Sequence, residues 1–207
     1  EIASCLVGSE MCIRDRSSRF LSNKRTGYFP SGSFAWRIDQ EEFMKGALEK
    51  GLSNLKLRLS YGSLGNNSVG NYDALATYAI DNSNYSLNNL LVQGLVQTKL
   101  ANRALTWEST YMTNVGVDFG FFNNRFTGTI DYFHKRTKDI LIELPAPLVH
   151  GSTDIPKQNS AIVTNQGVEF TLGWQDKIGD FSYGINGNFT YCLLYTSPSP
   201  RDKRQSR

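Results

Sequence analysis

The sequence has 207 residues, 12% of them aromatic, and a formal net charge of +3 at pH 7. The segment from Tyr191 onward holds four basic residues and one acidic residue, and the segment up to Arg16 holds two basic and three acidic residues. The rest of the chain is left with a net charge of about +1, which gives no support to nucleic-acid binding. No apolar run approaches the 18 or so residues that a transmembrane helix needs.

Both ends of the chain are expected to be non-native. Residues 6–16 (LVGSEMCIRDR) and 192–202 (CLLYTSPSPRD) resemble the two reading directions of one transposon-end adapter used to prepare sequencing libraries. We therefore expect residues 1–16 and 192–207 to be translated adapter, and residues 17–191 to be an internal fragment of a larger protein. All three cysteines lie in the flanks, so this fragment offers no disulfide, zinc–thiolate site or thiol nucleophile.

Strand-like alternation of apolar and polar residues first appears at residues 33–38 and 55–62. Between these two strands, residues 40–53 contain the only plausible helical turn, EEFMKGALEK. A long connection rich in Asn, Gly and Ser follows at 65–105, with a weaker strand at 72–80 inside it.

The strongest predicted element is a hairpin formed by residues 111–121 and 125–132. In each arm one face is mainly apolar and aromatic. The other face carries Met, Asn, Gly and Asp in the first arm and Arg, Thr and Asp in the second. Alternation over about ten residues is long for a soluble strand, where about 5–6 is typical, but suits a tilted membrane-crossing strand. Asn123 and Asn124 tolerate the left-handed backbone of a tight turn, and this turn would fix the register.

Two further strands are expected at 168–175 and 181–190, joined by a short turn at 176–180 in which Gly179 can take a positive φ. The connection before them, 142–163, is long. Short turns at one end and long loops at the other are typical of outer-membrane barrels, with the short turns periplasmic. Parity then places the 40–53 connection at the periplasmic end.

Aromatic residues near the strand ends predict the girdles that membrane barrels carry at the lipid–water boundary. They are Tyr28, Phe29, Trp36, Tyr61, Trp107, Tyr111, Phe121, Phe122, Tyr132, Phe133, Trp174 and Tyr183. The alternative is a soluble β-sandwich whose aromatics fill a core, although its strands would usually be shorter.

No pattern of catalytic or metal-binding residues stands out. His134 and His150 have no second ligand at metal-binding spacing, so no metal or cofactor is expected. Asp118, Asp131 and Glu169 fall on polar strand faces, where solvation explains them better than the carboxylate pair of a glycosidase. Neither a nucleophile elbow nor a phosphate loop is present, and we do not expect an enzyme.

The loop at 65–105 contains the candidate ligand-contacting residues. Tyr72, Tyr78 and Tyr85 lie there among Asn and Ser, and aromatic rings beside amide side chains can bind sugars. Tyrosine-rich loops are also ordinary features of extracellular surfaces, and this alternative stays open.

Taken together, these motifs resemble the C-terminal part of SusC/RagA-type TonB-linked outer-membrane proteins of the Bacteroidota. The likeness covers most of residues 27–190, and its most specific pieces are LTWE at 105–108, NVGVDF at 114–119, DYF with KRTKD at 131–139, and NQGVE at 165–169. One departure is Asn102-Arg103, where the family commonly has Asn-Pro before the LxWE segment.

The resemblance implies an all-β fold, an antiparallel segment of a plugged transmembrane barrel of about 22 strands. Such a barrel would lie in the outer membrane of a Gram-negative bacterium, in contact with its lipid, and import glycans or peptides. TonB would supply energy through a plug outside this fragment, and a SusD-like lipoprotein would cover the barrel. The alternative function is a carbohydrate-binding β-sandwich or a surface adhesin without transport.

Overall fold

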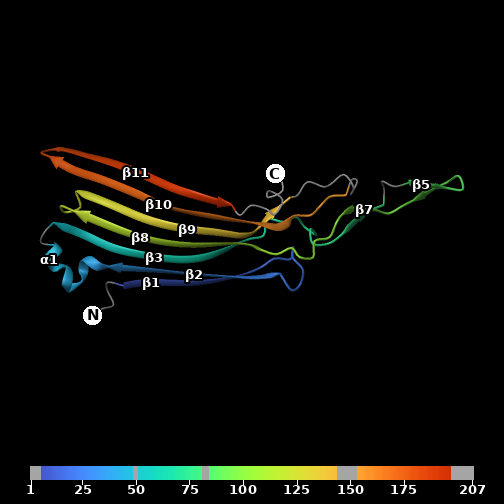
Figure 1. Ribbon diagram of the computed structural model, residues 1–207, viewed down its shortest axis with the longest axis horizontal. Coiled ribbons are helices and arrows are strands. Elements are labelled where there is room, and N and C mark those ends of the chain that lie inside the picture. Colours follow the sequence, from blue (N-terminus) through green and yellow to red (C-terminus); the bar gives the residue numbers. More distant parts are fainter. Residues whose placement is uncertain (1–5, 49–50, 81–83, 144–152, 197–207) are drawn as a thin grey trace, which may run out of the picture.

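The molecule is built around one antiparallel sheet. The structure, a computed structural model, describes residues 6–48, 51–80, 84–143 and 153–196. Seven long strands lie in the order β1-β2-β3-β8-β9-β10-β11, and the two edge strands, β1 and β11, are not paired with each other (Figure 1). The strands are β1 (Leu6–Arg16), β2 (Thr26–Arg37), β3 (Leu52–Asn66), β8 (Glu108–Phe121), β9 (Phe126–Ile142), β10 (Gln158–Ile178) and β11 (Phe181–Thr196). The predicted all-β antiparallel fold is confirmed, as an open part of a barrel.

The two ends of the sheet differ as predicted. The β2–β3 connection, the β8–β9 turn and the β10–β11 turn lie together at one end, and the long connections lie at the other (Figure 1). The first of these connections contains the expected helical turns, η2 (Ile38–Gln40), η3 (Glu42–Met44) and α1 (Lys45–Leu48). No helix among the described residues is long and apolar enough to cross a membrane.

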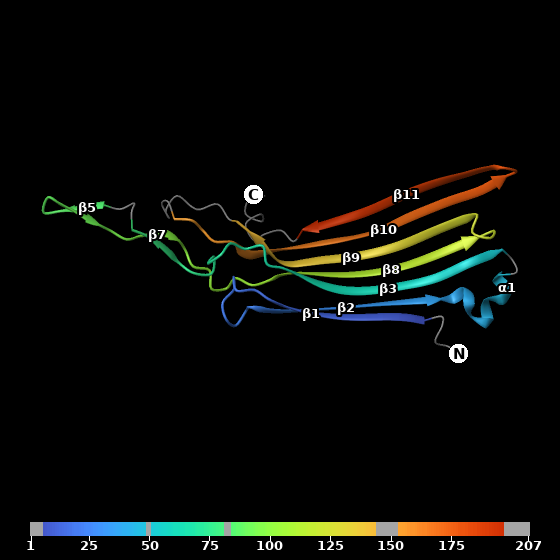
Figure 2. The ribbon, with the colours of Figure 1, turned by 180° about the vertical axis from the view of Figure 1, so that it is seen from behind.

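The long β3–β8 connection forms an arm that extends beyond the sheet (Figures 1 and 2). It contains two small hairpin-like pairs, β4 (Thr77–Ala79) with β7 (Val96–Lys99), and β5 (Asn84–Leu87) with β6 (Leu90–Gln93). The weak strand predicted at 72–80 is therefore confirmed only at its end, because residues 71–74 form a turn.

The central hairpin turn is more strained than its sequence predicts. Phe121 pairs with Phe126, and the residues between them include three with left-handed backbone: Phe122 (φ 55°), Asn123 (φ 56°) and Asn124 (φ 62°). Asparagine adopts this conformation readily, but a phenylalanine does so only where its surroundings hold it. Here the N–H of Phe122 donates to Gly51 O (2.9 Å) and that of Asn123 to Ser53 Oγ (2.7 Å), so Gly51 and the start of β3 hold the turn.

Apolar residues of neighbouring strands are in register and remain uncovered. Leu57 lies opposite Val117, Val117 opposite Ile130, and Ile130 opposite Phe170, which makes one row across four strands. Farther along the same face, Leu172 is 45% exposed. A β-sandwich would pack a second sheet on this face, and the described residues form none.

The expected extent of one loop needs correction. β10 already begins at Gln158, so the loop expected at 142–163 is shorter, and its last residues pair with β9 across register shifts around Ala161. Part of that loop, residues 144–152 with His150, lies outside the described residues.

The flanks expected to be non-native also form strand. Residues 6–16 make up β1, whose eleven residues are all exposed, and residues 192–196 end β11. Both lie at the open edges of the sheet, so the pairing from β2 to β10 does not involve them. Residues 1–5 and 197–207 lie outside the described residues.

Candidate functional site: the polar face and the loop end

An arginine links the predicted acidic residues of the polar face. Arg58 of β3 donates to both carboxylate oxygens of Asp118 on β8, through Nε (3.0 and 2.9 Å) and through Nη2 (2.7 Å to Oδ1). The same Nη2 donates to Asp131 of β9 at 2.9 and 3.1 Å. One cation therefore joins three strands, each of which offers a half-buried side chain.

A glycine makes this bridge sterically feasible. Gly116 of β8 lies opposite both Arg58 and Asp131, so the three residues form one row across the sheet. A Cβ at position 116 would lie 2.1 Å from Asp131 Oδ1 and 2.8 Å from Arg58 Nη2. Only glycine leaves room for the arginine to cross β8 without a shift of its neighbours.

The carboxylates thus do not form the free pair of a glycosidase. Asp118 and Asp131 share a cation, and Glu169 lies opposite Asp131 in the register. Glu108 is separate, since its carboxylate accepts from Leu141 N (3.2 Å) and from Asn66 Nδ2 (3.4 Å). The sequence predicted solvated carboxylates on the polar face. The structure shows in addition that Asp118 and Asp131 form an ion network with Arg58.

A hollow of about 390 Å³ opens beside this network. Its lining includes Arg58, Asp131 and Glu169 together with Asn114 and Asn165. The Oδ1 atoms of both asparagines are buried without a hydrogen-bond partner among the described residues. This arrangement favours a neighbour that donates hydrogen bonds.

His134 lies in β9, opposite Thr113 and Gln166, and the described residues hold no group of three potential metal ligands.

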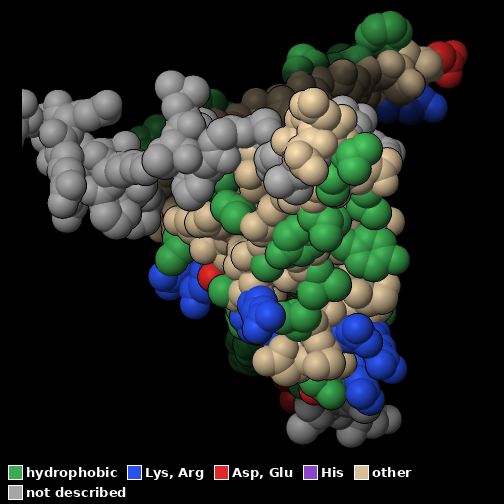
Figure 3. All heavy atoms as spheres, turned by 90° about the vertical axis from the view of Figure 1, so that its right-hand side faces the viewer, with side chains coloured by type: hydrophobic (Ala, Val, Ile, Leu, Met, Phe, Trp, Pro, Cys, Tyr) green, Lys and Arg blue, Asp and Glu red, His purple; other side chains and the backbone are tan. Residues whose placement is uncertain are grey.

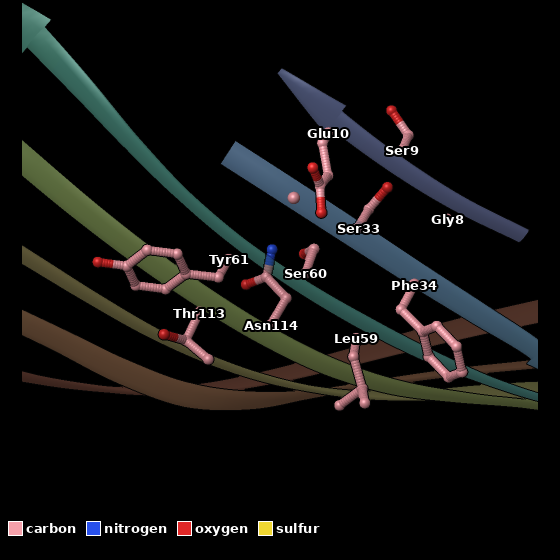
Figure 4. Close-up of a pocket in the computed structure, with 11 residues that line it drawn as sticks. Gly8, Ser9, Glu10, Ser33, Phe34, Leu59, Ser60, Tyr61, Thr113 and Asn114 are labelled. Carbon is pink, nitrogen blue, oxygen red and sulfur yellow. The ribbon is translucent and has the colours of Figure 1, made fainter. Parts of the chain in front are cut away.

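A larger hollow, about 620 Å³, lies across β1, β2, β3 and β8 (Figure 4). Glu10 lines it from β1, Ser33 from β2, Ser60 from β3 and Asn114 from β8. Its β1 wall, which includes Gly8 to Glu10, belongs to the segment that the sequence predicts to be non-native, so we assign no role to it.

A compact apolar core lies at the loop end of the sheet. Phe20 and Leu105 are each 1% exposed, and Phe29, Val69 and Trp107 complete the cluster. The Trp107 ring lies 5.2 Å from Phe20 and 5.6 Å from Phe29, and its Nε1 donates to Lys24 O (3.1 Å).

This core corrects part of the predicted aromatic girdle. Phe29 and Trp107 are buried in it, because Phe20, Val69 and Leu105 pack in the same cluster, which could not be inferred from strand periodicity. Other girdle residues are exposed as expected, including Tyr28, Tyr61, Tyr132 and Trp174. At the short-turn end, Phe119, Phe121, Phe126 and Trp174 form a chain of ring contacts.

The three candidate tyrosines lie along the arm rather than in one cluster. Tyr72 is exposed in the turn after β3 with φ 66°, and Tyr78 is exposed in β4. Tyr85 lies in β5, paired with Val92 in the other small sheet. No ring contact between Tyr72 and Tyr78 is found in the described part of the chain.

The sequence alone did not single out Arg58 or Gly116. The signal that could have found them is the register. Arg58, Gly116 and Asp131 share one row only once β9 is aligned with β8 through the Asn123-Asn124 turn and β3 is paired with β8.

Comparison with known proteins gives a consistent result. The family model described as "TonB dependent receptor-like, beta-barrel" matches residues 13–206, a range that extends into both flanking segments. TonB-dependent receptor P3 of Formosa agariphila is 34% identical over 92% of this chain and 19% of its own length. TonB-dependent receptor SusC of Bacteroides thetaiotaomicron is 34% identical over 86% of this chain and 18% of its own. The chain thus spans about a fifth of the length of these relatives.

Solved structures agree. The RagAB peptide transporter matches with a TM-score of 0.79 and 29% identity, over 95% of this chain and 21% of that one. The siderophore receptor PirA of Pseudomonas aeruginosa matches with a TM-score of 0.58 over 94% of this chain and 32% of that one, at 15% identity, a likeness of fold alone.

Proposed function

Because the chain belongs to the TonB-dependent receptor β-barrel family, whose members are outer-membrane proteins, we propose that it forms part of the wall and external loops of a nutrient importer. The observation that carries the proposal is the contrast between the two faces of one sheet. The apolar row through Leu57, Val117 and Ile130 suits lipid, and the opposite face carries the Arg58 network that suits an aqueous interior.

The partners follow from the same family. Likeness to SusC and to RagAB, a peptide importer, supports a SusD-like lipoprotein partner and a glycan or peptide substrate. TonB would act through a plug outside this chain. The short-turn end with α1 would face the periplasm and the β4–β7 arm the outside.

Sequencing outward from both ends of the native DNA tests the proposal first. A plug domain upstream and a neighbouring SusD-like gene are expected. An adhesin or hydrolase domain upstream would instead favour the non-transport alternative. Deletion of the full-length gene should then abolish growth on one glycan or peptide source while attachment to surfaces is unchanged; the reverse pattern would reject transport.

The arm is proposed to contact the substrate through Tyr72, Tyr78 and Tyr85. Their replacement by alanine in the full-length receptor should lower uptake, whereas replacement of Tyr132 on the apolar face provides the matched control. Uptake equal to wild type in the triple variant would remove these residues from the site.

A further inference from the structure

We infer that a hollow beside Tyr72 is a subsite for a carboxylate group of the ligand; the inference rests on the proposed import function. The hollow has a volume of about 350 Å³ and lies between the segment before β2 and the turn after β3. Its lining includes Arg19, Phe20, Arg25, Asn71, Tyr72 and Leu75. At this size it takes one end group of an oligomer rather than a whole chain.

The charge of the hollow is its first distinguishing property. Arg19 and Arg25 both line it, and no carboxylate of the described residues does. In the described ranges, neither arginine forms an ion pair, whereas Arg58 and Arg125 each have an aspartate partner. Viewed from the loop end, the surface shows prominent basic groups and few acidic ones (Figure 3).

Both arginines retain N–H donors that form no hydrogen bond with the described residues. Arg25 donates from Nε to Phe20 O (3.1 Å), and Arg19 donates from Nη1 to Asn67 O (3.3 Å). A guanidinium has five N–H donors in a planar fork that matches the two oxygens of a carboxylate. One backbone contact each fixes the direction of these side chains and leaves the remaining donors for a ligand.

The nearest acidic residue does not neutralise the pair. Asp73 follows Tyr72 in the chain and is 4% exposed. One of its oxygens is bound by the ammonium of Lys99, and the other accepts from Gly70 N at 2.7 Å. Its charge is therefore already compensated, and its contacts hold the 71–75 turn in place.

The opposite wall is held by residues of the predicted native fragment. The Phe20 ring packs on Trp107, whose Nε1 donates to Lys24 O, and Lys24 Nζ donates to Ala104 O at 2.6 Å. Residues 20–25 are therefore tied to residues 104–107 of that fragment, and Ser17 N donates to Arg25 O (2.9 Å) at the other end of the segment.

Tyr72 supplies the second distinguishing property. Its backbone is left-handed (φ 66°), an arrangement rare for an aromatic residue and often found at binding sites. The conformation leaves its side chain 69% exposed at the hollow, beside the apolar Leu75. A ligand could place its carboxylate on the arginines and its ring or side-chain carbon on Tyr72, which suits a uronic acid or an acidic peptide.

Binding to the purified full-length receptor tests the inference by calorimetry at low salt. The acidic probes are trigalacturonate and the peptide Ala-Glu-Glu-Ala; the neutral counterparts are maltotriose and Ala-Gln-Gln-Ala. We expect at least one acidic probe to bind more tightly than its counterpart. Arg19→Gln should weaken that probe about tenfold, as expected for one charge-assisted hydrogen bond, and leave the counterpart unchanged. Which acidic probe binds tells whether the carboxylate belongs to a sugar or a peptide.

Matched variants exclude a general charge effect. Lys138→Gln removes a basic residue of β9 whose ammonium lies over Tyr111, away from the hollow, and should not change binding. Arg19→Lys keeps the charge without the fork and should weaken the acidic probe less than Arg19→Gln does. The inference would be overturned if acidic and neutral probes bound equally well or if no probe bound. It would also be overturned if Arg19→Gln and Lys138→Gln lowered the affinity for the acidic probe equally.

Uptake assays separate this inference from the proposed function. A receptor that supports nutrient uptake but shows no acid preference refutes the subsite and leaves transport intact. A receptor that binds an acidic probe through Arg19 yet supports no uptake refutes transport and leaves the subsite.

Discussion

The sheet and the loop end of this chain bury their apolar residues in opposite ways. At the loop end, Phe20, Leu105 and Trp107 are covered by the chain itself, and the Trp107 Nε1 donates to Lys24 O. In the sheet, Ile130 and Leu172 are 40% and 45% exposed and have no covering layer in the described residues.

The two regions are therefore stabilised in different ways. The loop end draws its stability from the hydrophobic effect within the chain, as a soluble domain does. Among the described residues, the sheet leaves one apolar face uncovered and its two edge strands open, and both features favour association in water. Perturbations should therefore act differently in the two regions.

The largest expected effect comes from separating the chain from its barrel. Expressed alone in water, the 207-residue chain should aggregate or form oligomers, since β1 and β11 are open edges of the sheet. Size-exclusion chromatography with light scattering measures this. A soluble monomer that unfolds cooperatively would contradict the prediction and remove the contrast between the regions.

Next in size is the loss of the loop-end core. Trp107→Ala in the full-length receptor should destabilise the loop end by about 3–5 kcal/mol, the cost of emptying a buried aromatic site. The rate of proteolysis at residues 17–25 measures it. Trp174→Ala removes a ring on the apolar face that is 38% exposed; it is the control and should leave that rate unchanged. Equal rates in both variants would show that the core does not hold the loops.

A smaller effect is expected on the polar face. Gly116→Ala places a methyl group 2.1 Å from Asp131 Oδ1 and should cost about 1–3 kcal/mol by separating Asp131 from Arg58. Gly187→Ala in β11 is the matched control, because a Cβ at position 187 would meet no atom of the described residues within 4 Å. Thermal unfolding in detergent compares the two variants. If the midpoint temperature of unfolding were the same for Gly116→Ala and Gly187→Ala, the ion network would accommodate the added methyl group without loss of stability.

Sequence reasoning predicted the sheet better than the loop end, for a physical reason. Strand periodicity reports which side chains share a face, so the apolar rows, the short turns and the open barrel segment could be inferred from residues such as Val117 and Ile130. The burial of Trp107 depends on Phe20, 87 positions earlier in the chain, and no local pattern encodes that contact. Likewise, Arg58 and Asp131 meet only because Gly116 between them lacks a side chain.

The smallest predicted effect concerns the turn that fixes the register. Asn124→Ala places a residue with a Cβ but no compensating amide at φ 62°, which should cost about 1–2 kcal/mol. Asn124→Gly keeps the left-handed backbone accessible and should fall within about 0.5 kcal/mol of wild type, as a gain in backbone freedom offsets the loss of the amide. Thermal unfolding of the full-length receptor in detergent measures both. If the alanine variant were as stable as the glycine variant, the left-handed turn would not be what holds β8 and β9 in register. The contacts of Phe122 and Asn123 with Gly51 and Ser53 would then carry that role, and β3 rather than the turn would set the alignment of the polar row.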